Sequence, residues 1–414
     1  MLTETAPSKP AVSAACLIGF LALGLITPAH ALERLDVNLR GFGTLGMAHN
    51  REDGAGFIRD ITQPTGVKGG YSGHLDSRAG LQLDVSLPPK LSATLQVVTR
   101  YRYDGRYKPE IAWGFVKYSP TTNLDLRVGR LGWDVYMLSD SRDVGYSYLW
   151  VRPPVDYYGV LQFSKLNGAD LVASTPIGNG LLTAKLFAGS AVGNLALNKT
   201  FYVDTSDTDL VGGYLNYEQG SWQFRLGYTD INVDNTIKSR GANALPLLPQ
   251  ESLSGNYLDA ANKSEVKFWS AGATYDRGPL QGQLMFTYSE NGRVVPAWRS
   301  GYVSFGYRLG AWTPFVTYAV NKATSQPSAA TLPAMPLPEE LPFALANHAG
   351  AASPDQSTFS FGVRYDLLAN MALKLQYDHV NVRRAGRQMV LWRDAEPNWN
   401  GRARVFSATL DFVF

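Results

Sequence analysis

Apolar side chains occupy every second position along almost the whole chain, in segments of about ten residues, as transmembrane strands require. Residues 222–228 read WQFRLGY and residues 371–377 read MALKLQY, with apolar or aromatic side chains at alternate places. A period of two puts these side chains on one face of a strand. The alternation continues to the last residue, Phe414. The chain is therefore predicted to be all-β.

The connections between these segments separate a membrane barrel from a soluble sandwich, which also alternates. Aromatic residues collect near the segment ends, where a ring with a polar tip suits the level of the lipid headgroups. Longer polar connections, eight in all, alternate with seven short turns at 87–90, 119–123, 176–180, 217–221, 276–279, 309–311 and 366–370. This asymmetry favours strands that cross a membrane.

Seven short turns join fourteen strands, and the first (35–48) and last (403–414) segments bring the total to sixteen. An even number lets the last strand pair with the first and removes every free edge. Sixteen strands also leave an aqueous lumen, because diameter grows with strand number. The predicted fold is an all-β, transmembrane antiparallel β-barrel of about 16 strands, with long extracellular loops and short periplasmic turns.

The N-terminus has the form of an export signal. Residues 14–26 are an apolar run, AACLIGFLALGLI, and Ala29-His30-Ala31 has the small-x-small form of a cleavage site. The run is shorter than the about 20 residues of a membrane helix. We therefore expect a signal peptide over 1–31 and one barrel domain over 32–414. Cleavage would remove the single Cys16 and leave a chain without disulfides.

Gly41-x-Gly43-x-x-Gly46 has the spacing of a dinucleotide-binding fingerprint. That fingerprint requires a helix after the glycines, but the flanking residues alternate with a period of two, so the glycines are assigned to a strand. The four histidines after residue 31 are not paired at metal-ligand spacing, and no serine lies in a G-x-S-x-G elbow. No enzymatic activity, cofactor or metal site is predicted, and a net charge of +3 does not indicate a nucleic-acid partner.

Together these features resemble the porins of the Gram-negative outer membrane. Residues 139–159, SDSRDVGYSYLWVRPPVDYYG, are similar to a stretch of porin-like outer-membrane proteins of proteobacteria. The resemblance covers 32–414 and implies an outer-membrane location, contact with lipid and lipopolysaccharide, and a homotrimer. It also implies a third long loop folded into each lumen as a constriction, and this loop is 132–165 by our count. Porins usually oppose acidic residues of that loop to a basic ladder on the barrel wall.

If the apolar register faces lipid, basic residues dominate the inward positions. Inward acids are Asp36, Asp84, Asp125, Asp170, Asp378 and Asp411, and the further inward bases are Lys117, Lys185, Arg308, Arg364 and Lys374. Lys117 faces inward only if Val116 and Tyr118 meet lipid. The predicted pore lining is Arg40, Arg78, Arg100, Arg102, Arg127 and Arg225, and the predicted constriction residues are Asp134, Asp140, Arg142, Asp143 and Arg152. This positive surplus predicts a mild preference for anions.

The predicted function is a water-filled channel for passive diffusion of small hydrophilic solutes and ions. Two alternatives remain. A substrate-specific channel would use aromatic residues of the third loop, such as Trp150, to bind a ring-containing solute. An occluded barrel would instead carry its function on surface loops, as a binding or adhesion scaffold. Conductance separates an open lumen from an occluded one.

Overall fold

The computed structural model describes residues 35–87, 89–161, 163–234, 236–239, 263–291, 297–324, 355–383 and 391–414. The expected signal peptide, 1–31, lies outside the described residues, as does most of the fifth and seventh long connections, 232–262 and 321–356. Within the described residues, no helix is long and apolar enough to cross a membrane.

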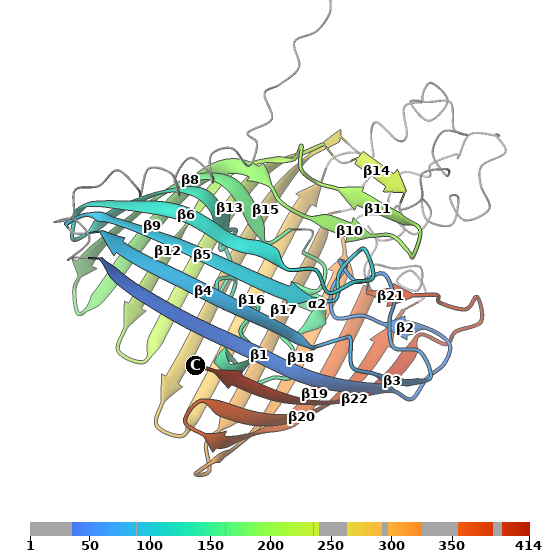
Figure 1. Cartoon of the computed structure of the whole chain (residues 1–414). Coiled ribbons are helices and arrows are strands. Elements are labelled where there is room, and N and C mark those ends of the chain that lie inside the picture. The colour runs from blue at the N-terminus through green and yellow to red at the C-terminus, as the bar shows by residue number, and fades with distance from the viewer. Residues whose placement is uncertain are drawn as a thin grey trace, which may run out of the picture.

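Sixteen long strands form one closed antiparallel sheet within the described ranges (Figure 1). In chain order they are β1 (Asp36–Asn50), β4 (Arg78–Leu87), β5 (Leu91–Arg100), β6 (Glu110–Thr121), β7 (Leu124–Gly132), β8 (Lys165–Ile177), β9 (Gly180–Ala191), β12 (Asp209–Gln219), β13 (Trp222–Asp234), β15 (Lys263–Arg277), β16 (Leu280–Asn291), β17 (Trp298–Tyr307), β18 (Trp312–Ala323), β19 (Asp355–Leu368), β20 (Met371–Val382) and β22 (Arg402–Val413). β1 pairs with both β4 and β22, which closes the barrel. The predicted fold class is confirmed.

Short and long connections lie at opposite ends of the barrel. The seven predicted short turns each join two consecutive long strands, for example β8 to β9 and β19 to β20. We call this the short-turn end, on the left of Figure 1, and the opposite one the long-loop end. The strands therefore end, and the short turns begin, where the two-residue alternation stops in the sequence.

Side chains alternate between the outer and the inner face of each strand. In β18, Trp312 and Val316 are exposed on the outer face, whereas Thr313 and Thr317 point inward and are buried. Outward rings also pair across strands near the short turns: Trp312 contacts Tyr365 in a tilted arrangement with ring centroids 4.3 Å apart. Such rings suit the boundary between lipid and water.

The glycines of β1 serve the seam at which the barrel closes. Gly43 is the register partner of Phe412, and Gly41 exchanges backbone hydrogen bonds of 2.9 Å with Phe414 in both directions. A Cβ atom at Gly41 would lie only 2.2 Å from the Phe414 ring. The glycines therefore leave room for aromatic rings that lie across the first strand, and their assignment to a strand is confirmed.

The ambiguous strand around 109–119 contains a bulge. Gln96 pairs with Trp113 but Val97 pairs with Ile111, so Ala112 is an extra residue and the alternation changes phase there. Beyond the bulge Lys117 lies on the inner face, where its Nζ is 3.6 Å from the Asp125 carboxylate. The sequence prediction assumes an unbroken period of two, and this assumption fails at Ala112 because one residue is inserted there.

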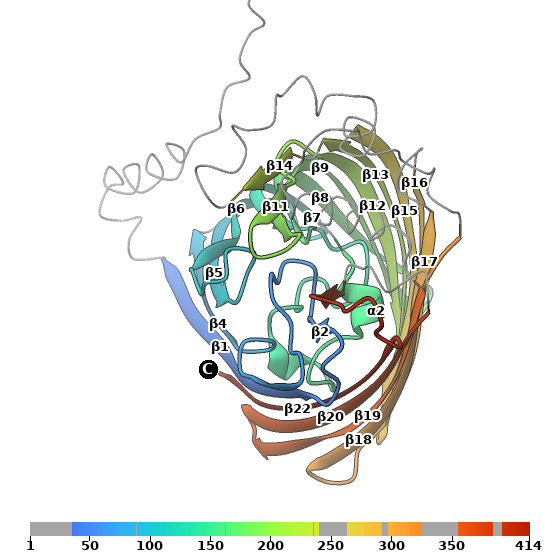
Figure 2. The same ribbon diagram turned by 90° about the vertical axis from the view of Figure 1, so that its right-hand side faces the viewer.

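Short elements lie at the long-loop end. β3 (Gly70–Ser72) adds to β1, and two small sheets form from β2 (Gly56–Phe57) with β21 (Trp392–Arg393), and from β10 (Asn194–Ala196), β11 (Phe201–Asp204) and β14 (Thr236–Ser239). Figure 2 shows β2 and the helix α2 (Val155–Tyr158) inside the outline of the ring. Phe57, Val203 and Trp392 from three different loops share one buried apolar cluster. These loops therefore pack on one another within the mouth.

Candidate channel lining and constriction

The segment 132–165, between β7 and β8, runs along the inner face of the barrel. Trp133 Nε1 donates to Thr229 Oγ1 on β13 at 3.1 Å, and Trp150 Nε1 donates to Thr317 Oγ1 on β18 at 2.9 Å. The backbone N–H of Val151 donates to Gln376 Oε1 on β20 at 2.9 Å. Because these strands are spread over one half of the ring, the segment follows the wall from the inside.

An apolar side of this segment packs against that half of the wall. Tyr158 Oη donates to the Met137 carbonyl oxygen at 2.8 Å and lies 3.0 Å from the Tyr302 hydroxyl on β17. Trp150 is only 1% exposed and contacts the Tyr302 ring edge-on at 5.8 Å. These aromatic rings therefore hold the loop on the wall, and in this arrangement the Trp150 ring is covered.

The opposite wall carries charge. Arg78 on β4 and Arg100 on β5 each place Nη1 3.7 Å from the Asp143 carboxylate of the third loop. We call the group around them the first charged cluster. Its seven bases and five acids are Arg59, Arg78, Arg100, Arg102, Arg142, Arg152 and Lys165 with Asp60, Asp76, Glu110, Asp143 and Asp378. The cluster therefore joins the first long loop (51–77, between β1 and β4), the third loop and the wall.

Asp60 shows how strongly these bases act. Its carboxylate lies 3.7 Å from both Arg100 and Arg142. Burial alone would raise the pKa of this carboxyl, but the guanidinium groups of Arg100 and Arg142 lower the pKa to about 2. At Asp143, burial likewise acts to raise the pKa of the carboxyl, but the guanidinium groups of Arg100 and Arg78 outweigh burial and hold the pKa well below its usual range. Both acids are therefore charged at neutral pH.

Arg152 ties several elements together in the interior. It is 1% exposed and donates to Asp76 at 2.6 Å, to Asp378 on β20 at 2.8 Å and to Ser407 on β22 at 2.6 Å. Burial opposes the charge, but Asp76 and Asp378 raise the pKa of the guanidinium. Of the predicted constriction residues, Arg152 is thus placed in a buried network between loops and wall.

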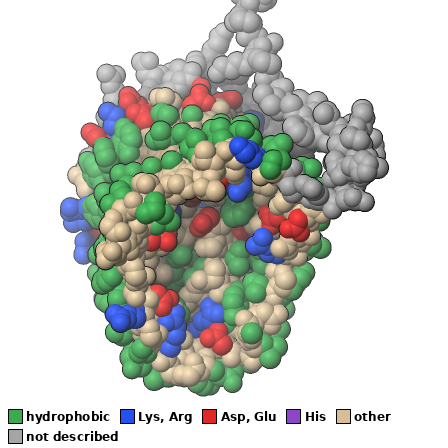
Figure 3. Space-filling model, turned by 90° about the vertical axis from the view of Figure 1, so that its left-hand side faces the viewer, with side chains coloured by type: hydrophobic (Ala, Val, Ile, Leu, Met, Phe, Trp, Pro, Cys, Tyr) green, Lys and Arg blue, Asp and Glu red, His purple; other side chains and the backbone are tan. Residues whose placement is uncertain are grey.

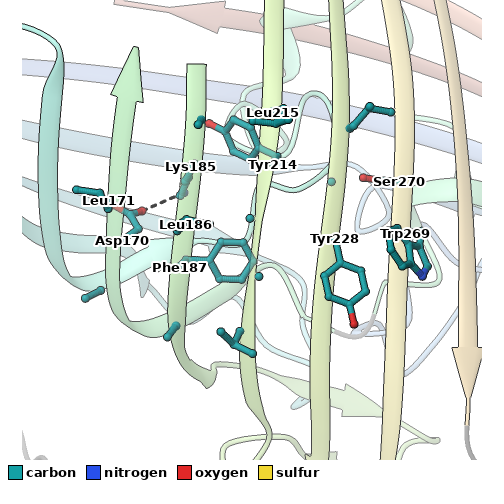
Figure 4. Close-up of a pocket in the computed structure, with 18 of the residues that line it drawn as sticks. Asp170, Leu171, Lys185, Leu186, Phe187, Tyr214, Leu215, Tyr228, Trp269 and Ser270 are labelled. Carbon is teal, nitrogen blue, oxygen red and sulfur yellow. Dashed lines mark ion pairs between the residues drawn. The ribbon is translucent and has the colours of Figure 1, made fainter. Parts of the chain in front are cut away.

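A second charged cluster lies on β7, β8 and β9. Lys185 Nζ is 2.5 Å from Asp134 and 3.0 Å from Asp170, as the close-up in Figure 4 shows for the latter pair. Arg127 Nη2 is 2.6 Å from Asp170. Arg225 donates to the carbonyl oxygen of Asp134 at 3.1 Å. Asp134 of the third loop therefore contacts the wall through its carboxylate at Lys185 and through its carbonyl oxygen at Arg225.

The remaining predicted residues lie at different levels. Arg40 is 3.1 Å from Asp84 and remains 60% exposed toward the short-turn end. Arg102 pairs with Glu110. Asp140 is exposed on the third loop, and Arg142 is buried in the first charged cluster. Among the inward bases, Arg364 donates to the Tyr146 carbonyl oxygen at 2.6 Å.

Five partners in the first charged cluster are absent from the sequence-based prediction: Arg59, Asp60, Asp76, Glu110 and Lys165. All five lie in a loop or at a strand end next to one, where the two-residue period gives no inward or outward assignment. One signal was present for Arg59 and Asp60. They interrupt the apolar stretch GFIRDI, 56–61, and buried charges occur in pairs.

The interior opens at the short-turn end. Figure 3 shows this face hollowed, with acidic and basic side chains lining the hollow inside an apolar rim. Outside the barrel, the wall is apolar: Leu186, Leu215 and Trp269 line a shallow groove over β9, β12 and β15 (Figure 4). The two faces of the same sheet therefore differ in the way that lipid outside and water inside require.

Comparisons with known proteins agree with this architecture. No curated protein matches the sequence at a significant level. The anion-selective porin of Comamonas acidovorans shares 14% identity with a TM-score of 0.55, over 92% of this chain and 100% of that chain. The outer-membrane channel DcaP of Acinetobacter baumannii shares 11% with a TM-score of 0.55, over 92% and 97%. OmpF of Salmonella typhi, in a complex with daunomycin, shares 14% with a TM-score of 0.52, over 91% and 97%.

At these identities the structural likeness establishes the fold. The family follows from the sequence, because a family described as Gram-negative porin matches residues 14–385. This span is most of the chain and includes all but the last of the sixteen strands. The chain belongs to the Gram-negative porins, and it is accordingly a channel protein of the outer membrane and not an enzyme.

Proposed function

We propose that this porin conducts small hydrophilic solutes and ions passively, with a mild preference for anions. The surplus of bases in the interior carries the proposal. The first charged cluster has seven bases to five acids. The second has Arg127, Lys185 and Arg225 against Asp134 and Asp170. A net positive field in a narrow passage concentrates anions.

We further propose that 132–165 is the constriction loop, which narrows the passage by reaching across the lumen to the charged wall of β4, β5 and β9. The loop is two-sided: its aromatic rings pack on β13, β17 and β18, and Asp134 and Asp143 point to bases on the opposite wall. Opposed charges of this kind produce a transverse field. Charges at that level therefore set the selectivity.

The test is the reversal potential of single channels in a planar bilayer under a salt gradient. Wild type should lean toward anions. Arg127→Gln removes an inward charge while Lys185 still pairs with Asp170, so its reversal potential should move toward cations. Arg130→Gln is the matched control on the same strand. Arg130 bonds Asn167 at 2.9 Å, and its neighbour Leu131 faces inward, so Arg130 lies on the outer face.

Four results would change the proposal. A cation-leaning wild type keeps the channel and refutes the anion preference. Equal shifts in both variants refute the assignment of Arg127 to the lumen. Absence of conductance from folded, inserted protein supports the occluded scaffold. Saturable block of current by one solute class would identify a substrate-specific channel.

We also propose that the barrel is exported with residues 1–31 as a signal peptide, assembles as a homotrimer and contacts lipopolysaccharide. Two outward bases support the last point: Arg299 on β17 and Lys322 on β18 are direct cross-strand partners, both exposed, near the long-loop end. Clustered bases at that level suit lipid phosphates. Native mass spectrometry in mild detergent reads out both assembly and retained lipid, and Arg299→Gln with Lys322→Gln should reduce the latter.

A further inference from the structure

Asp156 is a fully buried acid in the third loop. It lies in α2, which packs inside the barrel against β17, β18 and β19. Neither carboxylate oxygen has a hydrogen-bond partner, although the Thr358 hydroxyl and the Gln356 amide lie beside it. A buried carboxylate without a partner is costly, since burial penalises the charged form.

The wall facing α2 contains further unpartnered polar atoms. Ser300 and Asn321 are cross-strand partners, and Asn321 is in turn the partner of Gln356, so the three form one inward row across β17, β18 and β19. All are buried, and Ser300 Oγ, both amide atoms of Asn321, Gln356 Nε2 and Thr358 Oγ1 have no hydrogen-bond partner. A polar group of this kind is where proteins hold buried water.

The atoms in this row indicate what the site binds. Asn321 Nδ2 and Gln356 Nε2 are hydrogen-bond donors, and a donor of this kind cannot bind a metal ion. The hydroxyls of Ser300 and Thr358 and the Asp156 oxygens can accept hydrogen bonds or share a proton. Water and a protonated carboxyl satisfy both kinds of atom. We propose that Asp156 and this row form a proton-binding site, closed by water, which latches α2 and with it the constriction loop to the wall.

The charged and titratable groups around Asp156 leave it as the group that titrates near neutral pH. Tyr302 on β17 and Tyr157 and Tyr158 on α2 are neutral there, as phenols are. Asp378 on β20 is already paired with Arg152. Arg393, next to β19 through Trp392, donates to backbone carbonyl oxygens including that of Ala196 at 2.9 Å. At this level the described parts of β18 and β19 present Asn321, Gln356 and Thr358, which carry no charge.

The direction of the pH effect follows from linkage. Burial raises the pKa of the Asp156 carboxyl to about 7 from an ordinary 3.8. The docked loop therefore holds a proton that the released loop gives up, and docking is most favourable below pH 3.8. Between these two values the released fraction should rise about tenfold per pH unit, and above about 7 it should level off.

Accessibility of β18 beneath α2 gives a direct readout. Ala319 is 2% exposed on the inner face and is the partner of Thr358. We would introduce Ala319→Cys in the full chain with Cys16→Ser, and measure its modification by a small neutral thiosulfonate in outer membranes from pH 4 to 8. The rate is divided by that of the same chain carrying Asp156→Asn, which stays neutral and cancels thiol ionisation.

The proposal predicts a ratio that climbs about tenfold per unit up to about pH 7 and is then flat. Asp53→Asn, which removes an exposed acid of the first loop, should leave the climb unchanged. A ratio independent of pH refutes the latch, as does an equal loss of pH dependence in Asp53→Asn. If Asp156→Asn lowers the yield of folded protein, Asp156→Glu should keep the pH dependence.

Single-channel current is a second readout, and it rests on the proposed constriction. Release of α2 brings the loop into the passage, so wild type should spend more time in low-current states at pH 7 than at pH 5, and Asp156→Asn should not. Labelling that follows the predicted curve without a change in current would uphold the latch and refute the constriction. A flat labelling ratio would refute the latch whatever the current does.

Discussion

The ring of Phe412 in the last strand lies across Gly43 in the first strand, so close that a Cβ atom at Gly43 would be 2.3 Å from the ring. Gly43→Ala must therefore displace the ring or the strand. We expect a loss of about 1–3 kcal/mol in the free energy of unfolding, as for other overpacked sites. Urea titration in lipid vesicles measures this loss. Adding Phe412→Leu should recover part of this loss. If it recovers none, the loss is not caused by the Phe412 ring.

Removal of the Arg152 side chain should be far more damaging than removal of a surface arginine. Arg152→Ala leaves the buried carboxylates of Asp76 and Asp378 without their main partner, and breaking a buried pair costs about 3–5 kcal/mol. Arg308→Ala is the comparison, because the Arg308–Asp276 pair is exposed and such pairs contribute about 0–1 kcal/mol. Protease cleavage of the first and third loops should become much faster in Arg152→Ala alone.

Acid should loosen the first loop from the wall through Asp60. Its folded pKa of about 2 lies below the ordinary value of 3.8, so its contribution to stability is present above 3.8 and is lost as pH falls from there toward 2. The protection of the backbone amides over 56–63 against hydrogen exchange, taken relative to the intrinsic exchange rate at each pH, should therefore fall in that interval. Asp60→Asn should show faster exchange already at pH 7 and a weaker acid response. Asp53→Asn, an exposed acid of the same loop, should behave as wild type.

Trp150 should report packing of the loop and not solute binding. Trp150→Phe loses the hydrogen bonds to Ser304 at 3.0 Å and to Thr317 at 2.9 Å. Because these two hydroxyls still bond each other at 2.8 Å, we expect a cost of about 0.5–1.5 kcal/mol. Channel conductance and any solute block measured at pH 5 should be nearly unchanged. A large change in block with normal stability would show that the ring contacts solute and would favour the substrate-specific channel.

The barrel could be predicted from the sequence because one repeated physical requirement produces it. Every strand has to meet lipid on one face, so each strand carries the same alternation, and parity alone predicts that Arg78, Arg100 and Arg127 face inward. Parity fails where a residue is inserted, as at Ala112, because the alternation then changes phase.

The interior contacts could not be predicted in the same way. Arg152 and Asp76 lie in different loops, and their pairing depends on how two irregular segments fold inside the ring, for which no periodicity exists. The same holds for the row facing Asp156. Its residues are ordinary inward polar positions on three strands, and they become a site because α2 covers them.

The seam between β1 and β22 has a kinetic consequence. Gly43 lies in the first strand and its partner Phe412 in the last strand of the ring, so the first strand keeps one open edge until the last strand pairs with it. Contacts so distant in sequence form slowly. Until then a partly formed sheet carries two open strand edges, which are prone to aggregate. Pairing of β22 with β1 removes both edges in one step, so closing the seam protects the whole sheet at once.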